Sequence, residues 1–229
     1  AYTNGVLKFV HTNGKTYYYY FQSNGQAYTN GYKALNSSAY TDGTTLAQKV
    51  KDNKTYYYYF QKNGQAFRNG FLQFVHTNGK TYYYYFQPDG KAFTGGYKAV
   101  STRYYTDDKN VIKKASDTKQ YQYYFQSNGQ AYTKGYKGVS ARASVDAEGN
   151  ITPIDDDTVY YYYFQKNGQA YTDGLLEFVH TNGKTYYYYF QSNGQAYTNG
   201  YKGINSRAYT DGNGEIEKNP DDRVYYYYF

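Results

Sequence analysis

A run of aromatic residues that ends in phenylalanine recurs seven times along this chain of 229 residues. Neighbouring runs are 39 or 26 residues apart, and residues 22–125 align without a gap with residues 126–229 as two copies of a 104-residue repeat. This periodicity is typical of tandem arrays in which each repeat packs against the next. We expect residues 1–229 to form one elongated array with partial repeats at both ends. The runs end at Phe21, Phe60, Phe86, Phe125, Phe164, Phe190 and Phe229.

Tyrosine supplies the apolar area that other residues lack. Leu, Ile, Val and Phe together make up only 35 of the 229 residues, a fraction typical of disordered chains. The 40 tyrosines change this expectation, because a tyrosine ring buries much of its area while its hydroxyl stays in water or finds a partner. The sequence therefore predicts a thin core made of rings.

The net charge of +7 is spread over single lysines. No block of five or more basic residues occurs, so nucleic acid is not expected as a partner and the lysines are interpreted as solvated. No run of 18 apolar residues occurs, and membrane insertion is not expected. The sequence has no cysteine, which excludes disulfides and thiolate metal sites, and no cofactor is predicted.

The repeated motif alternates strand-forming residues with turns. Residues 16–22 read TYYYYFQ, which favours a strand, and Asn24-Gly25 follows, a pair that a two-residue type I′ turn prefers. We predict a hairpin whose second strand is residues 26–29, with another turn at residues 12–15 before the aromatic strand. Glycine interrupts every stretch and no helical period is present. The prediction is an all-β fold of stacked β-hairpin repeats.

The repeats are of two lengths, long ones of 39 residues and short ones of 26. Each long repeat has an added segment, and these segments hold most of the sequence variation. We expect an extra hairpin or loop in each of these segments. Their aspartate clusters, at residues 107–108, 155–157 and 221–222, lack the spacing of a calcium-binding loop and are interpreted as solvated. The added segments are residues 35–55, 100–120, 139–158 and 204–224.

Both faces of each aromatic strand carry rings. Alternate residues face opposite sides of a strand, so Tyr17 and Tyr19 share a face with Phe21, whereas Tyr18 and Tyr20 lie on the other face. One face can fill the interior of the array. The other is either covered by the next hairpin or left exposed as a platform of rings, and the sequence leaves both possibilities open.

The aromatic run, the glycine turn and the short stretch that ends in glycine and an aromatic residue resemble the cell-wall-binding and glucan-binding repeats of Gram-positive surface proteins. The clearest matches are residues 19–32, 84–97, 123–136 and 188–201. That family includes the C-terminal repeats of glucansucrases and choline-binding modules. The resemblance implies a β-solenoid of stacked hairpins that binds ligands between successive hairpins against aromatic rings. Tyr, Phe or Leu stands here where the family usually has tryptophan.

The Gly-Tyr-Lys corner of each long repeat is the predicted binding element. A tyrosine ring can lie against the apolar face of a sugar, while lysine and the glutamine after each aromatic run can bind hydroxyls. Short repeats have Phe71-Leu72 or Leu175-Leu176 there, which indicates packing alone. The alternative is a structural corner whose lysine extends along the surface to water. The predicted residues are Tyr32, Lys33 and Gln22; Tyr97, Lys98 and Gln87; Tyr136, Lys137 and Gln126; and Tyr201, Lys202 and Gln191.

Catalytic and metal-binding patterns are not found. His11, His76 and His180 share the context FVHTNGK beside a turn, and their placement in separate repeats keeps them apart. Metal ligation needs several converging donors, so we interpret them as surface histidines. No nucleophile, base and orienting residue recur together, and the chain is not expected to be an enzyme.

These observations predict a secreted or cell-surface repeat module that binds α-glucan or another cell-surface polysaccharide. Several weak sites on one array bind a polymer more strongly than any single site. One alternative is a structural or self-assembling spacer, whose strand edges at its ends favour end-to-end association. Another is choline-type cell-wall binding, for which the lack of tryptophan is unfavourable.

Overall fold

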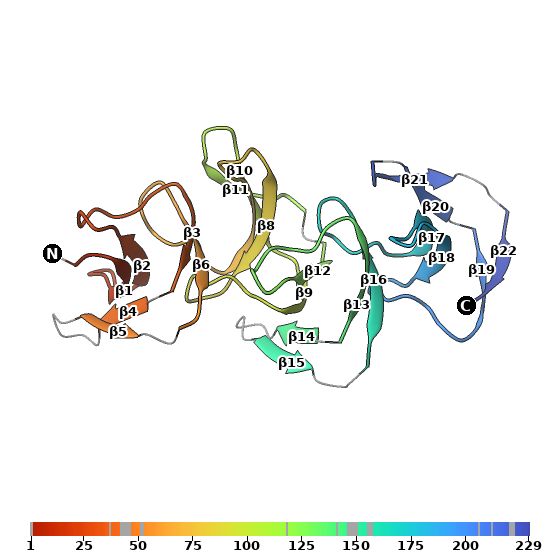
Figure 1. Cartoon of the computed structure of the whole chain (residues 1–229), viewed down its shortest axis with the longest axis horizontal. Helices are drawn as coiled ribbons and strands as arrows, with labels where there is room; N and C mark the ends of the chain where they lie inside the picture. Colours follow the sequence, from red (N-terminus) through yellow and green to blue (C-terminus); the bar gives the residue numbers. More distant parts are fainter. Residues whose placement is uncertain are drawn as a thin grey trace. The chain divides into compact units, whose positions relative to one another are not determined.

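The computed structural model describes residues 2–36, 38–41, 47–50, 53–117, 119–140, 142–145, 151–154, 158–205, 207–211, 213–219 and 223–229 (Figure 1). The chain divides into two compact units. Unit 1 comprises residues 1–94, 102–118 and 127–130, and unit 2 comprises residues 95–101, 119–126 and 131–229.

All regular elements in the described part of the chain are β-strands, which confirms the predicted all-β class. Within that part, no helix could span a membrane. Each repeat has a first strand and an aromatic strand. The first strands are β1 (Gly5–Val10), β3 (Gly31–Leu35), β7 (Gly70–Val75), β9 (Gly96–Val100), β13 (Gly135–Val139), β17 (Gly174–Val179) and β19 (Tyr201–Ile204). The aromatic strands are β2 (Thr16–Phe21), β6 (Tyr56–Phe60), β8 (Thr81–Phe86), β12 (Tyr121–Phe125), β16 (Tyr160–Phe164), β18 (Thr185–Phe190) and β22 (Tyr225–Tyr228).

Each aromatic strand pairs with the first strand that precedes it. β1 and β2 are antiparallel, with Gly5 opposite Phe21, and the same register recurs in the other repeats. The predicted second strand at residues 26–29 is therefore wrong in extent, because only Ala27 forms a bridge, to Phe21. Asn30 takes a left-handed φ of 52° and directs the chain into the next hairpin instead.

The Asn24-Gly25 turn is not the predicted type I′ turn. Type I′ needs positive φ at both central residues, but only Gly25 has it, at 79°. The Gly25 amide donates to the Gln22 carbonyl at 3.0 Å and the Gln22 amide to the Gln26 carbonyl at 2.9 Å, which is a type I turn closed by a left-handed glycine. Asn24 Oδ1 accepts a hydrogen bond from the Gln26 amide, so asparagine is favoured without a positive φ.

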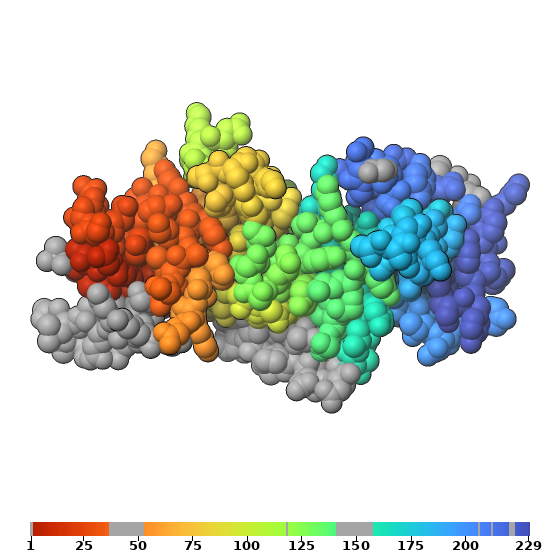
Figure 2. Space-filling view, viewed as in Figure 1, coloured from red at the N-terminus to blue at the C-terminus, as the bar shows by residue number. Residues whose placement is uncertain are grey.

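The added segment of every long repeat contains an inserted hairpin, as predicted. The first strand of each inserted hairpin pairs in parallel with the first strand of the preceding repeat: β4 with β1, β10 with β7, β14 with β9 and β20 with β17. β3, β13 and β19 belong to two-stranded sheets among the described strands. The β10–β11 hairpin projects from its own unit (Figure 2). The inserted strands are β4 (Ser38–Thr41), β5 (Ala47–Val50), β10 (Arg103–Thr106), β11 (Ile112–Lys114), β14 (Arg142–Val145), β15 (Ile151–Ile154), β20 (Arg207–Thr210) and β21 (Ile216–Asn219).

The core combines rings of the aromatic strands with apolar side chains of the first strands, such as Leu72 and Phe74 on β7. Tyr58 and Phe60 on β6 are buried, and Gly90, the turn glycine of the next repeat, packs onto Tyr58. A Cβ added at Gly90 would come within 3.2 Å of the Ala66 Cβ and 3.5 Å of the Tyr58 ring, and Gly90 has a φ of 81°. Glycine is therefore required there both for close packing and for its left-handed conformation.

Backbone hydrogen bonds also connect successive repeats within a unit. The Ala66 amide donates to the Tyr18 carbonyl and the Ala92 amide to the Tyr57 carbonyl, each at 2.8 Å. The described strands nevertheless form seven separate sheets. Repeated stacked hairpins are present, and a continuous solenoid across the whole chain stays a prediction. The single array over residues 1–229 likewise stays a prediction.

Candidate functional site

The tyrosine of the first Gly-Tyr-Lys corner lies within the core of unit 1. Tyr32 is half-buried and stacks on Tyr57 with ring centroids 5.9 Å apart, while its other contacts are Phe74, His76 and Tyr84. The Tyr84 hydroxyl donates to the Tyr32 hydroxyl at 3.0 Å. Burial, and then this hydrogen bond, raise the pKa of Tyr32 far above that of a free tyrosine. Tyr32 is therefore a neutral packing ring with only part of its surface open to a ligand.

Unit 2 repeats this arrangement. Tyr136 stacks on Tyr161 at 5.4 Å and contacts Phe178, His180 and Tyr188. Burial raises the pKa of Tyr136 as well, followed by a hydrogen bond to Tyr188. The 104-residue repeat of the sequence is thus a repeat of side-chain packing too.

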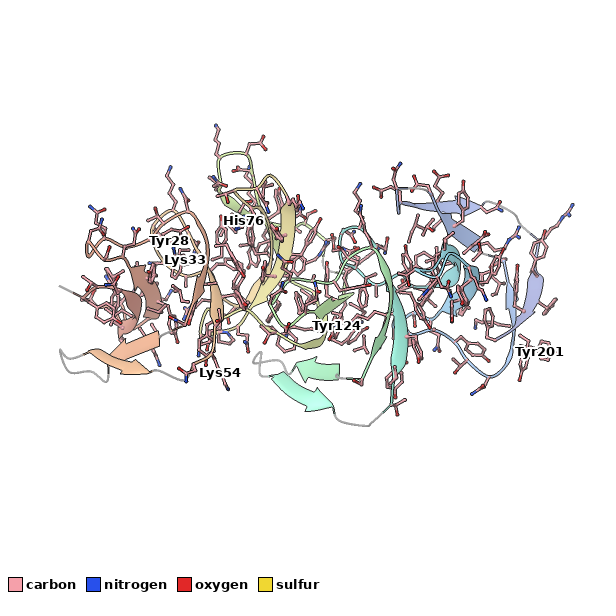
Figure 3. The ribbon with its side chains drawn as sticks, viewed as in Figure 1. Tyr28, Lys33, Lys54, His76, Tyr124 and Tyr201 are labelled. Carbon is pink, nitrogen blue, oxygen red and sulfur yellow. The ribbon has the colours of Figure 1, made fainter. Side chains whose placement is uncertain are left out.

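The other two corner tyrosines differ from this pair and from each other. Tyr97 is 8% exposed, and its hydroxyl donates to the Asn193 carbonyl at 2.9 Å. Tyr201 is 77% exposed and lies beside the last strands of the chain (Figure 3). Exposed rings at all four corners, as the sequence predicts, are therefore not observed.

The corner lysines lie over rings of the preceding hairpin. Lys33 Nζ is 5.8 Å from the centre of the Tyr20 ring and 5.3 Å from that of Tyr28. Lys137 lies over Tyr124 and Tyr132, and Lys202 over Tyr189 and Tyr197, at 4.5 to 5.3 Å. Each contact is a cation–π interaction.

Tyr32 and Lys33 consequently lie on opposite faces of β3. Adjacent residues of a strand point to opposite sides, so Tyr32 faces Phe74 and Tyr84 whereas Lys33 faces Tyr20. The structure does not bring ring and ammonium together into the single site expected from the sequence. Ligand binding by these residues stays a prediction.

Lys98 is the buried member of the lysine set, with 1% of its surface exposed. Burial lowers its pKa to about 8. β14 lies alongside β9 and pairs with it at Tyr97, next to Lys98. Lys98 is thus part of the protein interior and not of an open binding surface.

The main-chain carbonyls of the predicted glutamines accept hydrogen bonds from residues that precede earlier first strands. The Gln22 carbonyl accepts a hydrogen bond from the Asn4 amide at 3.4 Å, while the corner of Tyr32 is closed by Gln61, which accepts from Asn30. Gln87, Gln126 and Gln191 accept from Asn69, Gly95 and Asp173 in the same way. All four predicted glutamines are half-buried. These contacts use main-chain carbonyls, and ligand binding by the four side chains stays a prediction.

A hollow of about 500 Å³ in unit 1 is the candidate functional site. Its aromatic wall consists of Tyr28, Tyr32, Tyr59 and Phe74, from the turn before β3 and from β3, β6 and β7. Tyr59 and Phe74 are each 3% exposed, so they form the deep part of the wall. Figure 3 labels Tyr28, Lys33 and His76 in this part of unit 1.

Polar groups from two hairpins line the rest of the hollow. The β10–β11 hairpin contributes Thr106, Asp107, Asp108 and Asn110, and the β7–β8 turn contributes His76 beside Thr77. Asp107 is already engaged, since its Oδ1 accepts from the amides of Lys109 and Val111 and its Oδ2 pairs with Lys113 at 3.0 Å. These contacts, the Val111 amide first, lower the pKa of Asp107. The exposed Asp108 and Asn110 are the side chains best placed to meet a ligand.

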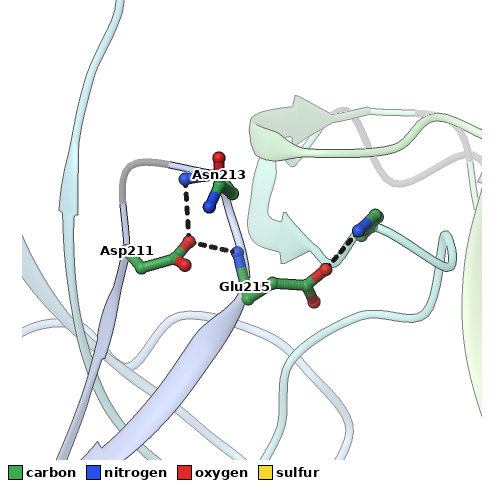
Figure 4. Close-up of polar contacts among 4 residues, drawn as sticks. Asp211, Asn213 and Glu215 are labelled. Atoms are coloured by element: carbon green, nitrogen blue, oxygen red, sulfur yellow. Dashed lines mark hydrogen bonds and ion pairs between the residues drawn. The ribbon is translucent and has the colours of Figure 1, made fainter.

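The same turn in unit 2 has changed its polar groups. Asp211, the counterpart of Asp107, accepts hydrogen bonds from the amides of Asn213 and Glu215 at 2.8 Å each (Figure 4). Glu215 pairs with Lys166. Gly214 stands at the position of Asn110, and a Cβ added there would lie 3.9 Å from Lys134 Cδ. The long Lys134 side chain therefore reaches the region that is open around Asn110 in unit 1.

Sequence reasoning missed the polar side of the hollow. The exposure of Asp108 agrees with its interpretation as solvated, but nothing in the sequence shows that the inserted hairpin pairs backwards onto β7 and so brings Asp107 and Asp108 to the hollow. Residues 155–157 and 221–222 lie outside the described residues. Within the described part of the chain, no group of three or more acidic or histidine side chains could hold a metal ion. The three histidines contact tyrosine rings of their own hairpins, Tyr17, Tyr82 and Tyr186, and His76 and His180 also contact Tyr32 and Tyr136.

No protein-family model and no curated protein sequence matches the chain. Among solved structures, it is similar to truncated alternansucrase from Leuconostoc mesenteroides NRRL B-1355, with a TM-score of 0.36 and 16% identity over 72% of this chain. The chain spans only 10% of the length of that protein. It is also similar to choline binding protein F from Streptococcus pneumoniae, with a TM-score of 0.26 and 18% identity over 94% of this chain and 80% of that one.

A third similar structure is the Cpl-1 endolysin complexed with a peptidoglycan analogue, with a TM-score of 0.25 and 16% identity over 74% of this chain and 34% of the endolysin chain. These three neighbours are thus an alternansucrase, a choline binding protein and an endolysin. All these TM-scores are below 0.5, so the site is placed from this chain's own side chains.

Proposed function

We propose that this chain is a non-catalytic, extracellular carbohydrate-binding module, and that the Tyr32 hollow binds a short stretch of a polysaccharide such as α-glucan. The observation that supports this best is the composition of the hollow, an aromatic wall opposite exposed Asp108 and Asn110. The apolar face of a sugar packs on rings, and its hydroxyls bind carboxylate and amide groups. The volume of about 500 Å³ lies within the range of roughly 300–1,000 Å³ that is common for small-molecule sites.

An open hollow of this kind predicts weak binding to each site. A dissociation constant of about 1 mM corresponds to a standard binding free energy of about −4 kcal/mol. A polymer that reached several sites at once would bind more strongly, by roughly 10² to 10⁴. Binding of a trisaccharide and of a polymer should therefore differ widely in strength.

Calorimetry with isomaltotriose, dextran, starch and purified cell wall tests the proposal. Tyr28→Ala removes a ring from the wall and should weaken isomaltotriose binding by about tenfold or more. Tyr28→Phe is the matched control, because Phe67 and Phe93 occupy the equivalent position in other repeats. Heat at baseline for all four ligands would overturn the proposal.

A second variant tests the polar side without disturbing the core. Asp108→Gly together with Asn110→Gly gives the turn the glycines that residues 212 and 214 carry in the second copy. Asn110 has a φ of 57°, a conformation that glycine adopts freely. Thermal stability should stay unchanged while isomaltotriose binding falls; unchanged binding would show that these side chains do not contact the sugar.

A second candidate function is self-association through the β19–β22 hairpin. Tyr201, Tyr226 and Tyr228 are 77%, 79% and 68% exposed, which is an unusual grouping of uncovered rings. Light scattering over a range of concentrations should show growth of the particle mass, reduced in Tyr226→Ser but not in Tyr161→Ser. A constant monomer mass would exclude this function.

A further inference from the structure

One aromatic strand departs from the tyrosine pattern. β12 reads YQYYF, and Gln122 stands where Tyr18 stands 104 residues earlier. Its backbone is placed as in the other copies, since the Gln122 carbonyl accepts from the Ala170 amide at 2.8 Å just as the Tyr18 carbonyl accepts from Ala66. The glutamine side chain therefore occupies a position built for a ring.

In unit 1 this position is filled. The guanidinium of Arg68 lies 5.7 Å from the centre of the Tyr18 ring, and Arg68 donates to the Pro88 carbonyl at 3.4 Å. Burial raises the pKa of Tyr18, as expected for a covered phenol. Ring and guanidinium together cover the space between the aromatic strand and the two following turns.

In unit 2 all three of these residues are replaced by residues that cannot fill the same space. Gln122, Thr172 and Ser192 stand where Tyr18, Arg68 and Pro88 stand in the first copy. A hollow of about 430 Å³ occupies the site, and these three residues line it. The hollow is thus a specific difference between two otherwise closely similar copies.

The lining of this hollow is rich in carboxamides. Gln120, Gln165 and Gln169 line it together with Gln122. The buried Oε1 of Gln122 has no hydrogen-bond partner within the described part of the chain. A buried acceptor without a donor is unfavourable, so this oxygen is able to accept a hydrogen bond from water or from a ligand hydroxyl that replaces the water.

The charges at the rim balance each other. Lys119 and Asp173 are both exposed and both line the hollow, so the site has no net preference for an anion or a cation. Carboxamides both donate and accept, which matches the paired hydroxyls of a sugar. Tyr121 adds a half-buried ring to the lining.

We propose that the Gln122 hollow is a second saccharide-binding site, one that recognises the hydroxyls of a neutral sugar unit mainly through carboxamides. It rests on the proposed function, and it differs from the Tyr32 hollow in chemistry because amides replace most of the aromatic wall. The site belongs to one copy of the 104-residue repeat, since Tyr18 and Arg68 fill the other copy.

The test fills the hollow with the residues that the first copy uses. Gln122→Tyr combined with Thr172→Arg should keep the thermal stability, because the same pair packs in unit 1. Isomaltotriose titration by calorimetry should then lose one binding event, and the affinity for dextran should fall by about tenfold. Tyr28→Ala should leave the binding event at Gln122 in place.

A direct readout follows the side chain itself. The ¹⁵N carboxamide signal that is missing from Gln122→Asn identifies Gln122, and it should shift when isomaltotriose is added to the wild-type protein. In Tyr28→Ala the same signal should still shift. This measurement does not depend on the stability of the filled variant.

The outcomes separate this proposal from the proposed function. If the wild-type protein binds isomaltotriose, but the filled variant binds equally well and the Gln122 signal stays constant, the second site does not exist and the Tyr32 site stands. If no saccharide binds to the wild-type protein, both proposals fail. A Gln122 signal that shifts in Tyr28→Ala supports the second site alone.

Discussion

The first strands β7 and β3 carry different residues at the same place, and the difference follows from what lies beside each strand. Leu72 on β7 is fully buried and packs with Tyr59 and Phe67 of the preceding hairpin. Lys33 on β3 lies over Tyr20 and Tyr28, the equivalent rings. β10 pairs with β7, whereas among the described strands β3 pairs with β6 alone.

The comparison teaches that neighbouring structure decides this position. Beside an inserted hairpin the side chain is enclosed, and leucine is favoured; without one, a lysine covers the rings with its stem and keeps its ammonium group near water. Leu176 on β17 and Lys137 on β13 repeat the pattern in unit 2. Lys98 is the exception, since β9 is paired with β14 and yet carries lysine.

Placing a lysine on a first strand beside an inserted hairpin should have the largest effect on the stability of the protein. Leu72→Lys buries an ammonium group among rings and should lower the free energy of unfolding by about 3–5 kcal/mol. Urea denaturation measures the loss. Gln73→Lys, at an exposed position of the same strand, is the control and should change stability by less than about 0.5 kcal/mol. Equal effects of the two changes would contradict the enclosure of Leu72.

Replacing Lys98, the lysine that does lie beside an inserted hairpin, should raise the free energy of unfolding. Lys98→Leu restores the residue that other enclosed first strands carry, and the free energy of unfolding should rise by about 1–3 kcal/mol. Differential scanning calorimetry of the variant beside the wild-type protein measures this gain. A destabilised Lys98→Leu protein would mean that the ammonium group is better accommodated than its burial indicates.

The stability difference between these two proteins should depend on pH. Burial lowers the pKa of Lys98 to about 8 in the folded state, while a lysine of the unfolded chain titrates near about 10.4. Between these values the unfolded wild-type chain binds more protons than the folded one, so wild-type stability rises with pH and the advantage of Lys98→Leu shrinks by about 1–3 kcal/mol. Urea melts of both proteins from pH 7 to about pH 9.5 check this, because the tyrosine ionisation that begins there is common to the two proteins and cancels in the difference. A constant difference would show that Lys98 titrates normally.

Lysine on an open first strand should matter least. Lys33→Leu loses a cation–π contact of about 0.5–1 kcal/mol but gains apolar contact with the same rings, so stability should change by less than about 0.5 kcal/mol. The same result is expected for Lys137→Leu, in which Tyr124 and Tyr132 are the rings. A loss above about 2 kcal/mol in either variant would remove the distinction between the two kinds of strand.

Much of the local fold could be predicted from the sequence, because strand and turn preferences act within a few residues. The aromatic strands, the glycine turns and the extra hairpins of the long repeats follow directly from composition and period. The pairing of the aromatic strand does not follow from the sequence, because turns at Asn13-Gly14 and Asn24-Gly25 flank β2 on both sides. A turn motif alone does not show which neighbouring segment pairs with the strand. In the structure the left-handed Asn30 leads the chain into β3, and its amide donates to the Gln61 carbonyl of the next hairpin.

The site was less predictable than the fold. The corner residue Tyr32 lines the candidate hollow, whereas Lys33 lies over Tyr20 on the other face of β3 and Gln22 is not in the lining. Asp108 and Asn110 come from a segment that pairs in parallel with an earlier strand. Long-range parallel pairing of this kind leaves no periodic mark in the sequence. The sequence shows that Gln122 replaces a tyrosine of the first copy. Only the structure shows that a hollow lies at Gln122, where Tyr18 and Arg68 fill the space in the first copy.

The backward pairing of each inserted hairpin makes the order of the repeats matter. Among the described strands, β10 of the following repeat completes the outer edge of β7. During synthesis, the backbone hydrogen-bonding groups on that edge of β7 therefore stay unpaired until β10 has emerged from the ribosome. Deleting a long repeat would therefore harm its predecessor as well as itself. The pairing also crosses the boundaries of the 104-residue copies, because β14 of the second copy pairs with β9 of the first, and β4 of the first copy pairs with β1 before it. The first long repeat of each copy therefore depends on the repeat that precedes the copy.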